Sequence, residues 1–131
     1  MADTAAGPPP RVMVVDDEPL NLDLLRRTLR GFDVVEAVSA AEALEWLEAN
    51  NGALSLILCD QLMPGRSGTQ LAALVRSRWP AIRFVLVTGV DESEEVLAAR
   101  RDGVVDDVVA KPWNATALRA RLRQLADTRS R

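Results

Sequence analysis

The chain has no histidine, no tyrosine and a single cysteine, Cys59, among its 131 residues. Without histidine it lacks the usual general base, which excludes Ser-His-Asp catalysis and most zinc sites. One cysteine cannot form a disulfide within the chain. We expect Cys59 to be a small buried strand residue rather than a nucleophile.

A strong excess of one charge and a long apolar run are missing as well. The net charge is −3, which gives no basis for broad electrostatic binding to nucleic acid. No apolar run is long enough to span a membrane, and the opening segment MADTAAGPPP lacks the basic and apolar regions of a signal peptide. We therefore expect a soluble cytoplasmic protein with neither nucleic acid nor a membrane as its partner.

The residues that are present have the composition of one globular domain. Apolar residues make up 48% of the chain and charged residues 27%, and the length suits a single domain. Residues 1–10 are small, rich in proline and without periodicity, so we expect a disordered arm there. We expect one domain over residues 11–126 and a frayed C-terminus over residues 127–131.

Short apolar runs alternate with helical patterns through this domain. The runs predict five strands, at residues 11–15, 33–38, 54–59, 82–89 and 107–110. Helical spacing of apolar residues, with capping signals such as the S-x-x-E pattern of Ser39 and Glu42, predicts a helix after each strand. These helices are expected to begin at Pro19, after Ser39, near residue 67, after the acidic segment 91–94 and after Asn114. Such alternation favours a parallel sheet with right-handed crossovers, so the predicted fold is a doubly wound (βα)5 three-layer sandwich of the α/β class.

Polar side chains that can carry chemistry stand at or directly after the ends of four of the five predicted strands. They are Asp16 and Asp17, Asp60, Thr88 and Lys111, in chain order. Each alone has an ordinary explanation as a turn, cap or surface residue. Because the carboxyl ends of parallel strands meet at one edge of a sheet, we expect these side chains to lie close together. Lys111 is also the only lysine among 16 basic residues, and a compact ammonium suits a small oxyanion in a tight pocket better than a guanidinium does.

Three carboxylates at one edge repel each other unless a cation balances their charge. All-oxygen ligands without histidine or cysteine favour Mg2+, with Mn2+ as a second possibility, and Asp17 and Asp60 are the expected ligands. A carboxylate can also accept a phosphoryl group, whose charged oxygens a metal, Lys111 and Thr88 would stabilise. The residues thus predict phosphoryl-transfer chemistry at this edge of the sheet.

Four segments resemble, in order and spacing, the signatures of the bacterial response-regulator receiver domain: VMVVDDEP, LILCDQLMPGRSG, FVLVTG and VVAKPW. The resemblance covers residues 11–126 and implies the flavodoxin-like strand order 2-1-3-4-5. It implies that Asp60 is the phosphoacceptor, with Thr88 and Lys111 contacting the phosphoryl group. It also implies a cis peptide bond between Lys111 and Pro112.

The same resemblance implies a metal site and partners. Mg2+ would be bound by Asp17, by Asp60 and by the backbone carbonyl of Leu62, and Asp16 would act through a water. The phosphoryl donor would be a phosphohistidine on a sensor histidine kinase or on a histidine phosphotransfer protein, and an unknown downstream protein would read the result. The implied protein is a signalling switch rather than a turnover enzyme, and a monomer or a weak phosphorylation-dependent dimer. It either stands alone or is the first domain of a longer regulator.

The chain departs from the family where a switch aromatic usually stands. Val108 occupies the position three residues before the lysine, where the family usually has Tyr or Phe. A phosphorylation-independent binding module with the receiver fold is therefore an alternative. Trp113, next to the predicted site, either takes part in it or packs locally. A phosphatase of the haloacid-dehalogenase type is a remote alternative, because it needs a second aspartate where this chain has Leu62.

Overall fold

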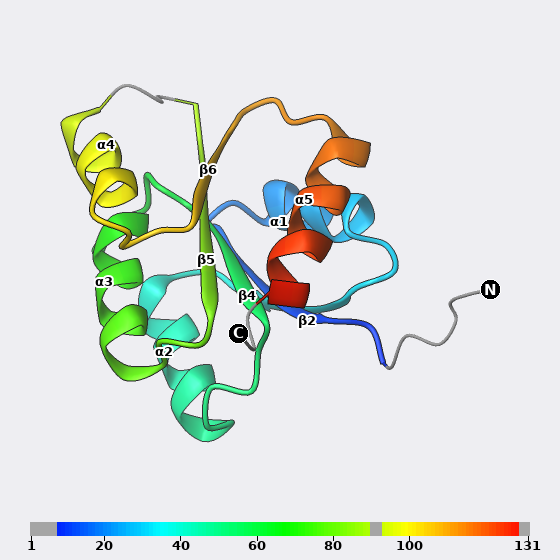
Figure 1. The fold of residues 1–131 in the computed structure, drawn as a ribbon, viewed down its shortest axis with the longest axis horizontal. Helices are drawn as coiled ribbons and strands as arrows, with labels where there is room; N and C mark the ends of the chain where they lie inside the picture. Colours follow the sequence, from blue (N-terminus) through cyan, green and yellow to red (C-terminus); the bar gives the residue numbers. More distant parts are fainter. Residues whose placement is uncertain (1–7, 90–92, 129–131) are drawn as a thin grey trace.

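The computed structural model describes residues 8–89 and 93–128. These residues form a three-layer α/β sandwich, in which α1 and α5 cover one face of a parallel sheet and α2, α3 and α4 cover the other (Figure 1). The strands are β2 (Arg11–Val15), β3 (Asp33–Ala37), β4 (Leu56–Asp60), β5 (Arg83–Thr88) and β6 (Asp107–Ala110). The helices are α1 (Pro19–Thr28), α2 (Ala40–Ala49), α3 (Gly68–Arg78), α4 (Glu94–Arg101) and α5 (Ala115–Thr128).

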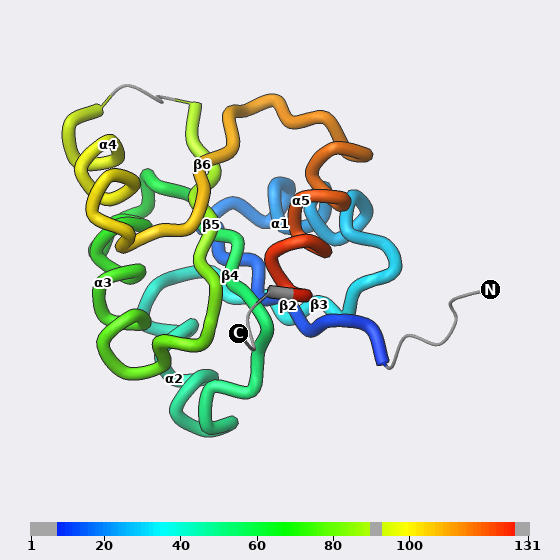
Figure 2. The backbone as a smooth tube through the Cα atoms, in the orientation of Figure 1, coloured from blue at the N-terminus to red at the C-terminus, as the bar shows by residue number. Residues whose placement is uncertain are grey.

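The sheet has the order β3-β2-β4-β5-β6, and every neighbouring pair is parallel. Counted in chain order this is 2-1-3-4-5, which confirms the predicted flavodoxin-like topology; the backbone trace in Figure 2 follows the crossovers. The register places Asp60 opposite Val87 and Thr88 opposite Ala110. The carboxyl ends of β4, β5 and β6 therefore meet at one edge.

The two central strands are buried on both faces. All five residues of β4 and four of the five residues of β2 are buried, which explains why their sequences are continuous apolar runs. Met13 and Ile57 pack with the side chains of α2, α3 and α4, whereas Val14 and Leu58 pack with those of α1 and α5. Burying one such side chain stabilises the fold by roughly 1.5–3 kcal/mol, so these strands hold the site edge rigidly.

Capping residues set where the helices begin. Ser39 caps α2 as predicted, since its hydroxyl accepts from the Glu42 N–H at 3.0 Å. The Glu42 carboxylate accepts from the Val38 N–H at 2.9 Å, one residue earlier than a reciprocal capping box requires. A full capping box occurs instead at α3, between Ser67 and Gln70.

Several predicted boundaries differ from the structure by one or two residues, at the strands predicted for residues 33–38, 54–59 and 82–89. Asp60 is the last residue of β4 rather than the first residue after it, because it still pairs with Val87 of β5. Helix α4 begins at Glu94 and is capped by Ser93, whose hydroxyl accepts from the Val96 N–H at 3.3 Å. Asp91, predicted to open that cap, lies outside the described residues.

Residues 1–7 and 129–131 lie outside the description, so the disordered arm and the frayed C-terminus stay predictions. Within residues 8–89 and 93–128, no helix combines the length and apolar character needed to cross a bilayer.

Candidate functional site

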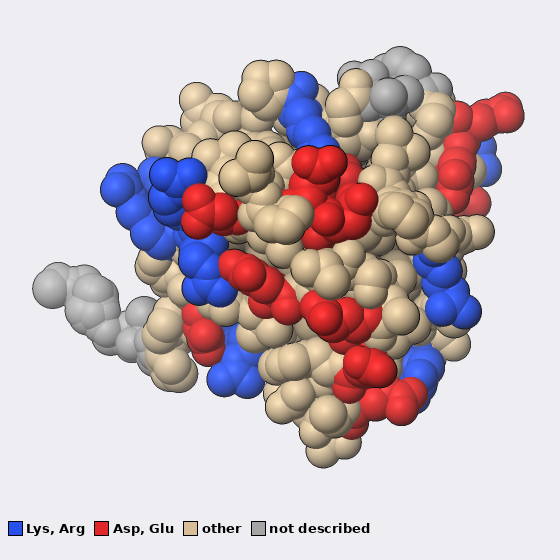
Figure 3. Space-filling model, turned by 180° about the vertical axis from the view of Figure 1, so that it is seen from behind, with Lys and Arg blue, Asp and Glu red and all other residues tan. Residues whose placement is uncertain are grey.

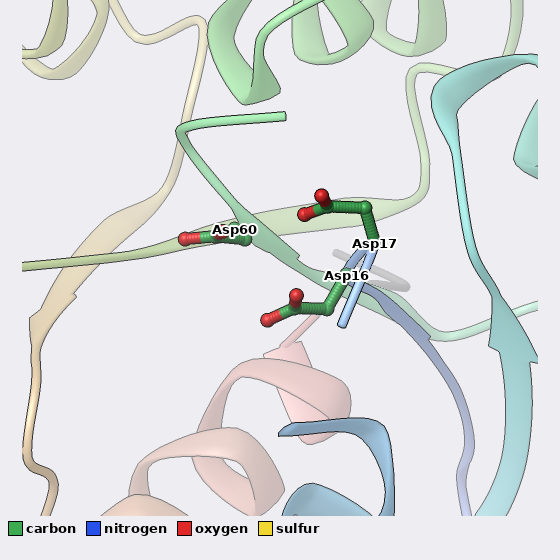
Figure 4. Close-up of side chains that lie close together, drawn as sticks. All are labelled: Asp16, Asp17 and Asp60. Atoms are coloured by element: carbon green, nitrogen blue, oxygen red, sulfur yellow. The ribbon is translucent and has the colours of Figure 1, made fainter. Parts of the chain in front are cut away.

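Strands β2 and β4 bring three carboxylates together at the sheet edge (Figure 4). Asp16 and Asp17 directly follow β2, and Asp60 ends β4. One oxygen from each carboxylate lies within 4.8 Å of the others. Asp16 and Asp60 are buried and Asp17 is exposed, so the group is open to solvent on one side.

The backbone fixes Asp16 in place. Its N–H donates to the Ala37 carbonyl of β3 at 3.1 Å, and its Oδ1 accepts from the Glu18 N–H at 2.9 Å. Burial raises the pKa of the Asp16 carboxyl; the hydrogen bond from Glu18 opposes this rise, and the charge of Asp60 adds to it. Asp16 is thus a carboxylate that is costly to keep charged without a cation nearby.

Lys111 places its ammonium group directly beside the Asp60 carboxylate. Its Nζ lies 3.0 Å from Asp60 Oδ1, and its backbone N–H donates to the Thr88 carbonyl at 3.1 Å. The peptide bond to Pro112 is cis, as the resemblance implied. Thr88 is almost fully buried at the end of β5. The structure therefore brings Asp16, Asp60 and Lys111 together, with Thr88 at the end of the neighbouring strand.

The segment after Asp60 turns sharply toward α3. Gly65 has a positive φ of 80°, which suits glycine. At Gly68 an added Cβ would meet the Asp60 carbonyl at 2.7 Å and Leu86 Cδ2 at 2.6 Å, so the start of α3 packs directly against the strand end. Leu62 lies within this segment with 65% of its surface exposed.

Two residues next to the site, Cys59 and Trp113, pack into the hydrophobic core. Cys59 is fully buried in β4, as expected, and its Sγ lies 3.2 Å from the Asp60 carbonyl; burial raises the pKa of its thiol. Trp113 Nε1 donates to Thr28 Oγ1 of α1 at 3.3 Å, and its ring packs with the α1 and α5 side of the core. Of the two readings of Trp113, the contacts favour local packing.

Val108 replaces the expected switch aromatic with a small aliphatic side chain. It is half-buried and packs against the core side that faces α2, α3 and α4. Sequence reasoning missed a nearby set of polar residues: Gln61, Ser67, Thr69 and Glu95 are joined by hydrogen bonds. Thr69 and Glu95 are 26 positions apart, and no local pattern signals such a pair.

The molecular surface carries both acidic and basic side chains on the face shown in Figure 3. Seen from behind in Figure 3, acidic side chains gather toward the middle of the face and basic side chains lie mostly toward its margins. The largest group of basic side chains in this view lies at its left margin, next to acidic ones.

Comparison with known proteins identifies the family. The model of the response regulator receiver domain matches residues 12–123. The hydrogenase transcriptional regulatory protein HoxA of Cupriavidus necator is 41% identical over 103 residues, which cover 78% of this chain and 21% of that protein. The transcriptional regulatory protein YvrH of Bacillus subtilis is 33% identical over 115 residues, which cover 86% of this chain and 47% of that protein. The chain thus spans about a fifth to a half of the length of the first curated relatives it matches.

Solved structures agree with this assignment. A receiver domain protein from Methanospirillum hungatei has a TM-score of 0.84 at 27% identity, covering 93% of this chain and 97% of that one. The response regulator TrrA of Thermotoga maritima, solved in complex with Mg2+ and BeF, has a TM-score of 0.77 at 29% identity, covering 88% and 98%. Phosphorylation and Mg2+ binding at an acidic pocket are typical of this family. The chain therefore belongs to the response regulator receiver domains of two-component signalling.

Proposed function

We propose that this receiver domain accepts a phosphoryl group on Asp60 in a Mg2+-dependent reaction and thereby switches a protein-binding surface. The observation that carries the proposal is the pairing of Asp60 with the only lysine of the chain, at 3.0 Å, inside a group of three carboxylates. Lys111 balances part of the acidic charge and leaves the rest to a divalent cation.

The donor set fits Mg2+, with Mn2+ as a second choice. The carboxylates of Asp17 and Asp60, with the Leu62 backbone carbonyl, would bind the ion directly, and Asp16 would act through a water. All these donors are oxygens, which Mg2+ prefers, and the open side leaves room for waters and phosphoryl oxygens. When bound, the ion neutralises charge on the carboxylates and on the phosphoryl group.

Asp60, Lys111 and Thr88 take part in the phosphoryl transfer itself. An Asp60 carboxylate oxygen attacks phosphorus, forming a P–O bond as the P–N bond to the donor histidine breaks. The Lys111 ammonium and the Thr88 hydroxyl donate to phosphoryl oxygens and stabilise their charge. The chain contains no histidine, so a phosphohistidine donor belongs to a partner, either a sensor histidine kinase or a histidine phosphotransfer protein.

The output of the switch is a protein contact, made with a separate protein or with another part of a longer regulator. We propose a signalling role rather than turnover catalysis for the domain itself. Val108 favours one second candidate, a receiver fold that binds its partner without phosphorylation. The half-buried valine packs into the core and cannot act as an aromatic ring that swings between two positions.

Labelling with radioactive acetyl phosphate separates these candidates. Wild-type protein should take up label when Mg2+ is present and should take up none when EDTA removes Mg2+. Asp60→Asn should take up no label in either condition. Asp33→Asn is the matched control, because Asp33 begins β3 at the opposite edge of the sheet. Equal labelling of Asp60→Asn, or no labelling of the wild type, refutes the phosphoacceptor role. Labelling without any NMR shift change around Gly89 would favour the binding module instead.

A further inference from the structure

A second polar cluster lies between the start of α3 and the start of α4. We call Gln61, Ser67, Thr69 and Glu95 the α3–α4 polar cluster. Gln61 and Thr69 are buried, with 4% and 6% of their surface exposed. They are joined twice: the Thr69 N–H donates to Gln61 Oε1 at 2.9 Å, and Gln61 Nε2 donates to Thr69 Oγ1 at 3.4 Å. Both polar atoms of a buried amide are thereby given partners.

Glu95 lies in the first turn of α4 and forms the side of the cluster that faces this helix. Its Oε2 accepts from Ser67 Oγ at 2.9 Å and also from the Thr69 hydroxyl. These bonds, that of Thr69 first, lower the pKa of Glu95, and the amino end of α3 also favours an anion beside it. The other end of α4 is held separately, by Arg76, which donates to the Gly103 carbonyl at 2.7 Å.

Helix capping does not account for these contacts. Ser67 and Gln70 already form a complete box: the Ser67 N–H donates to Gln70 Oε1 at 2.8 Å, and the Gln70 N–H donates to Ser67 Oγ at 3.3 Å. The hydrogen bonds that Thr69 forms with Gln61 and with Glu95 are additional to that box. They bring the end of β4 and the start of α4 to one shared hydroxyl.

Gln61 connects the cluster to the site, because it directly follows Asp60 and its backbone is tied on both sides. Its N–H donates to the Val87 carbonyl of β5 at 3.1 Å, and its own carbonyl accepts from the Gly68 N–H at 3.0 Å. A displacement at the end of β4 thus reaches the Gln61 amide with no residue between. The Thr69 hydroxyl accepts from Gln61 while it donates to Glu95, and hydrogen bonds in such a chain strengthen one another.

We propose that the α3–α4 polar cluster transmits phosphorylation of Asp60 to α4, in place of the switch aromatic that Val108 replaces. The inference rests on the proposed function, since it takes Asp60 as the phosphoacceptor. The added charge on Asp60 shifts the start of the following segment and turns the Gln61 amide. The Thr69 hydroxyl then changes its hold on Glu95, and the amino end of α4 moves with that carboxylate.

The test compares amide NMR spectra with and without beryllofluoride and Mg2+, the combination present in one solved relative. Thr69→Val removes the hydroxyl at nearly constant volume, and Glu95→Gln removes the charge. Glu94→Gln is the matched control, since it changes the same charge in the same helical turn outside the cluster. Thr69→Val and Glu95→Gln should keep Asp60 labelling within about twofold of wild type and lose more than about half of the shift change across α4. Glu94→Gln should keep both.

Thr69→Ser retains the hydroxyl and serves as the rescue variant, so it should restore the α4 response. A full α4 response in Thr69→Val and Glu95→Gln overturns the inference. Loss of the response in Thr69→Ser overturns it as well, because the methyl group and not the hydroxyl would then matter. Absence of label in the wild type refutes the proposed function, and the inference falls with it.

Discussion

Replacing Asp16 by asparagine is expected to stabilise the metal-free protein. Asp16 is buried, and its carboxylate oxygen lies within 4.8 Å of that of Asp60. At that separation two like charges repel by about 3 kcal/mol for an effective dielectric constant of about 20. Solvent at the open side of the site reduces this, so we expect a net gain of about 1 kcal/mol, or about 3–5 °C in Tm. Asparagine keeps the Oδ1 acceptor for the Glu18 N–H.

Asp60→Asn is the informative comparison, because Asp60 forms the direct ion pair with Lys111, whereas Lys111 has only a lesser effect on Asp16. The contact of Asp60 with Lys111 at 3.0 Å corresponds to about 5 kcal/mol on the same scale. Removing the Asp60 charge therefore loses an attraction together with the repulsion. We expect Asp60→Asn to raise the Tm less than Asp16→Asn does.

Thermal unfolding in EDTA at pH 7 measures the difference, and Mg2+ should then stabilise the wild type more than Asp16→Asn. The pKa of Asp16 is raised in the folded state by burial, so the wild type is relatively more stable below the unfolded pKa and loses that stability as pH rises through the folded pKa. The advantage of Asp16→Asn should accordingly shrink in acid. A Tm for Asp16→Asn at or below that of the wild type in EDTA at pH 7 would refute the electrostatic reasoning.

Two further substitutions probe the geometry around Asp60. Gly68→Ala should destabilise the protein by about 1–3 kcal/mol in urea unfolding, because the new methyl group meets the Asp60 carbonyl at 2.7 Å and Leu86 at 2.6 Å; an unchanged midpoint would mean that α3 moves aside freely. Lys111→Arg should reduce the rate of acetyl phosphate labelling at least about tenfold with little change in stability, since a guanidinium fork does not reproduce a compact ammonium. A labelling rate equal to that of wild type would show that only the charge at this position matters.

The topology and the site edge were predictable because they depend on short-range patterns. Apolar runs such as that of β4 mark buried parallel strands, and strand order then places Asp60 and Lys111 at the same edge. The strand boundary at Asp60 was missed by one residue, because hydrogen-bonded pairing with β5 extends beyond the apolar run. Hydrophobicity alone does not register such pairing.

Contacts between side chains that are far apart in the sequence could not be predicted from it. Trp113 donates a hydrogen bond to Thr28, which lies 85 positions away in the sequence. Thr69 donates one to Glu95, which lies 26 positions away. These pairs depend on how α1, α3, α4 and α5 are placed on the sheet, which no single segment encodes. For the same reason, the sequence alone does not decide whether Trp113 takes part in the site or packs locally.

Burial differs sharply between the strand that carries Asp60 and the strand that precedes Lys111. Every residue of β4 is buried at the centre of the sheet, whereas β6 is an edge strand and is at most half-buried. Amide hydrogens of β4 should therefore exchange only when the whole domain unfolds, and those of β6 through local opening. Asp60 thus ends the strand that should exchange slowly, and Lys111 follows the strand that should open locally. Local opening of β6 should therefore displace Lys111 from Asp60 more often than any opening of β4 does.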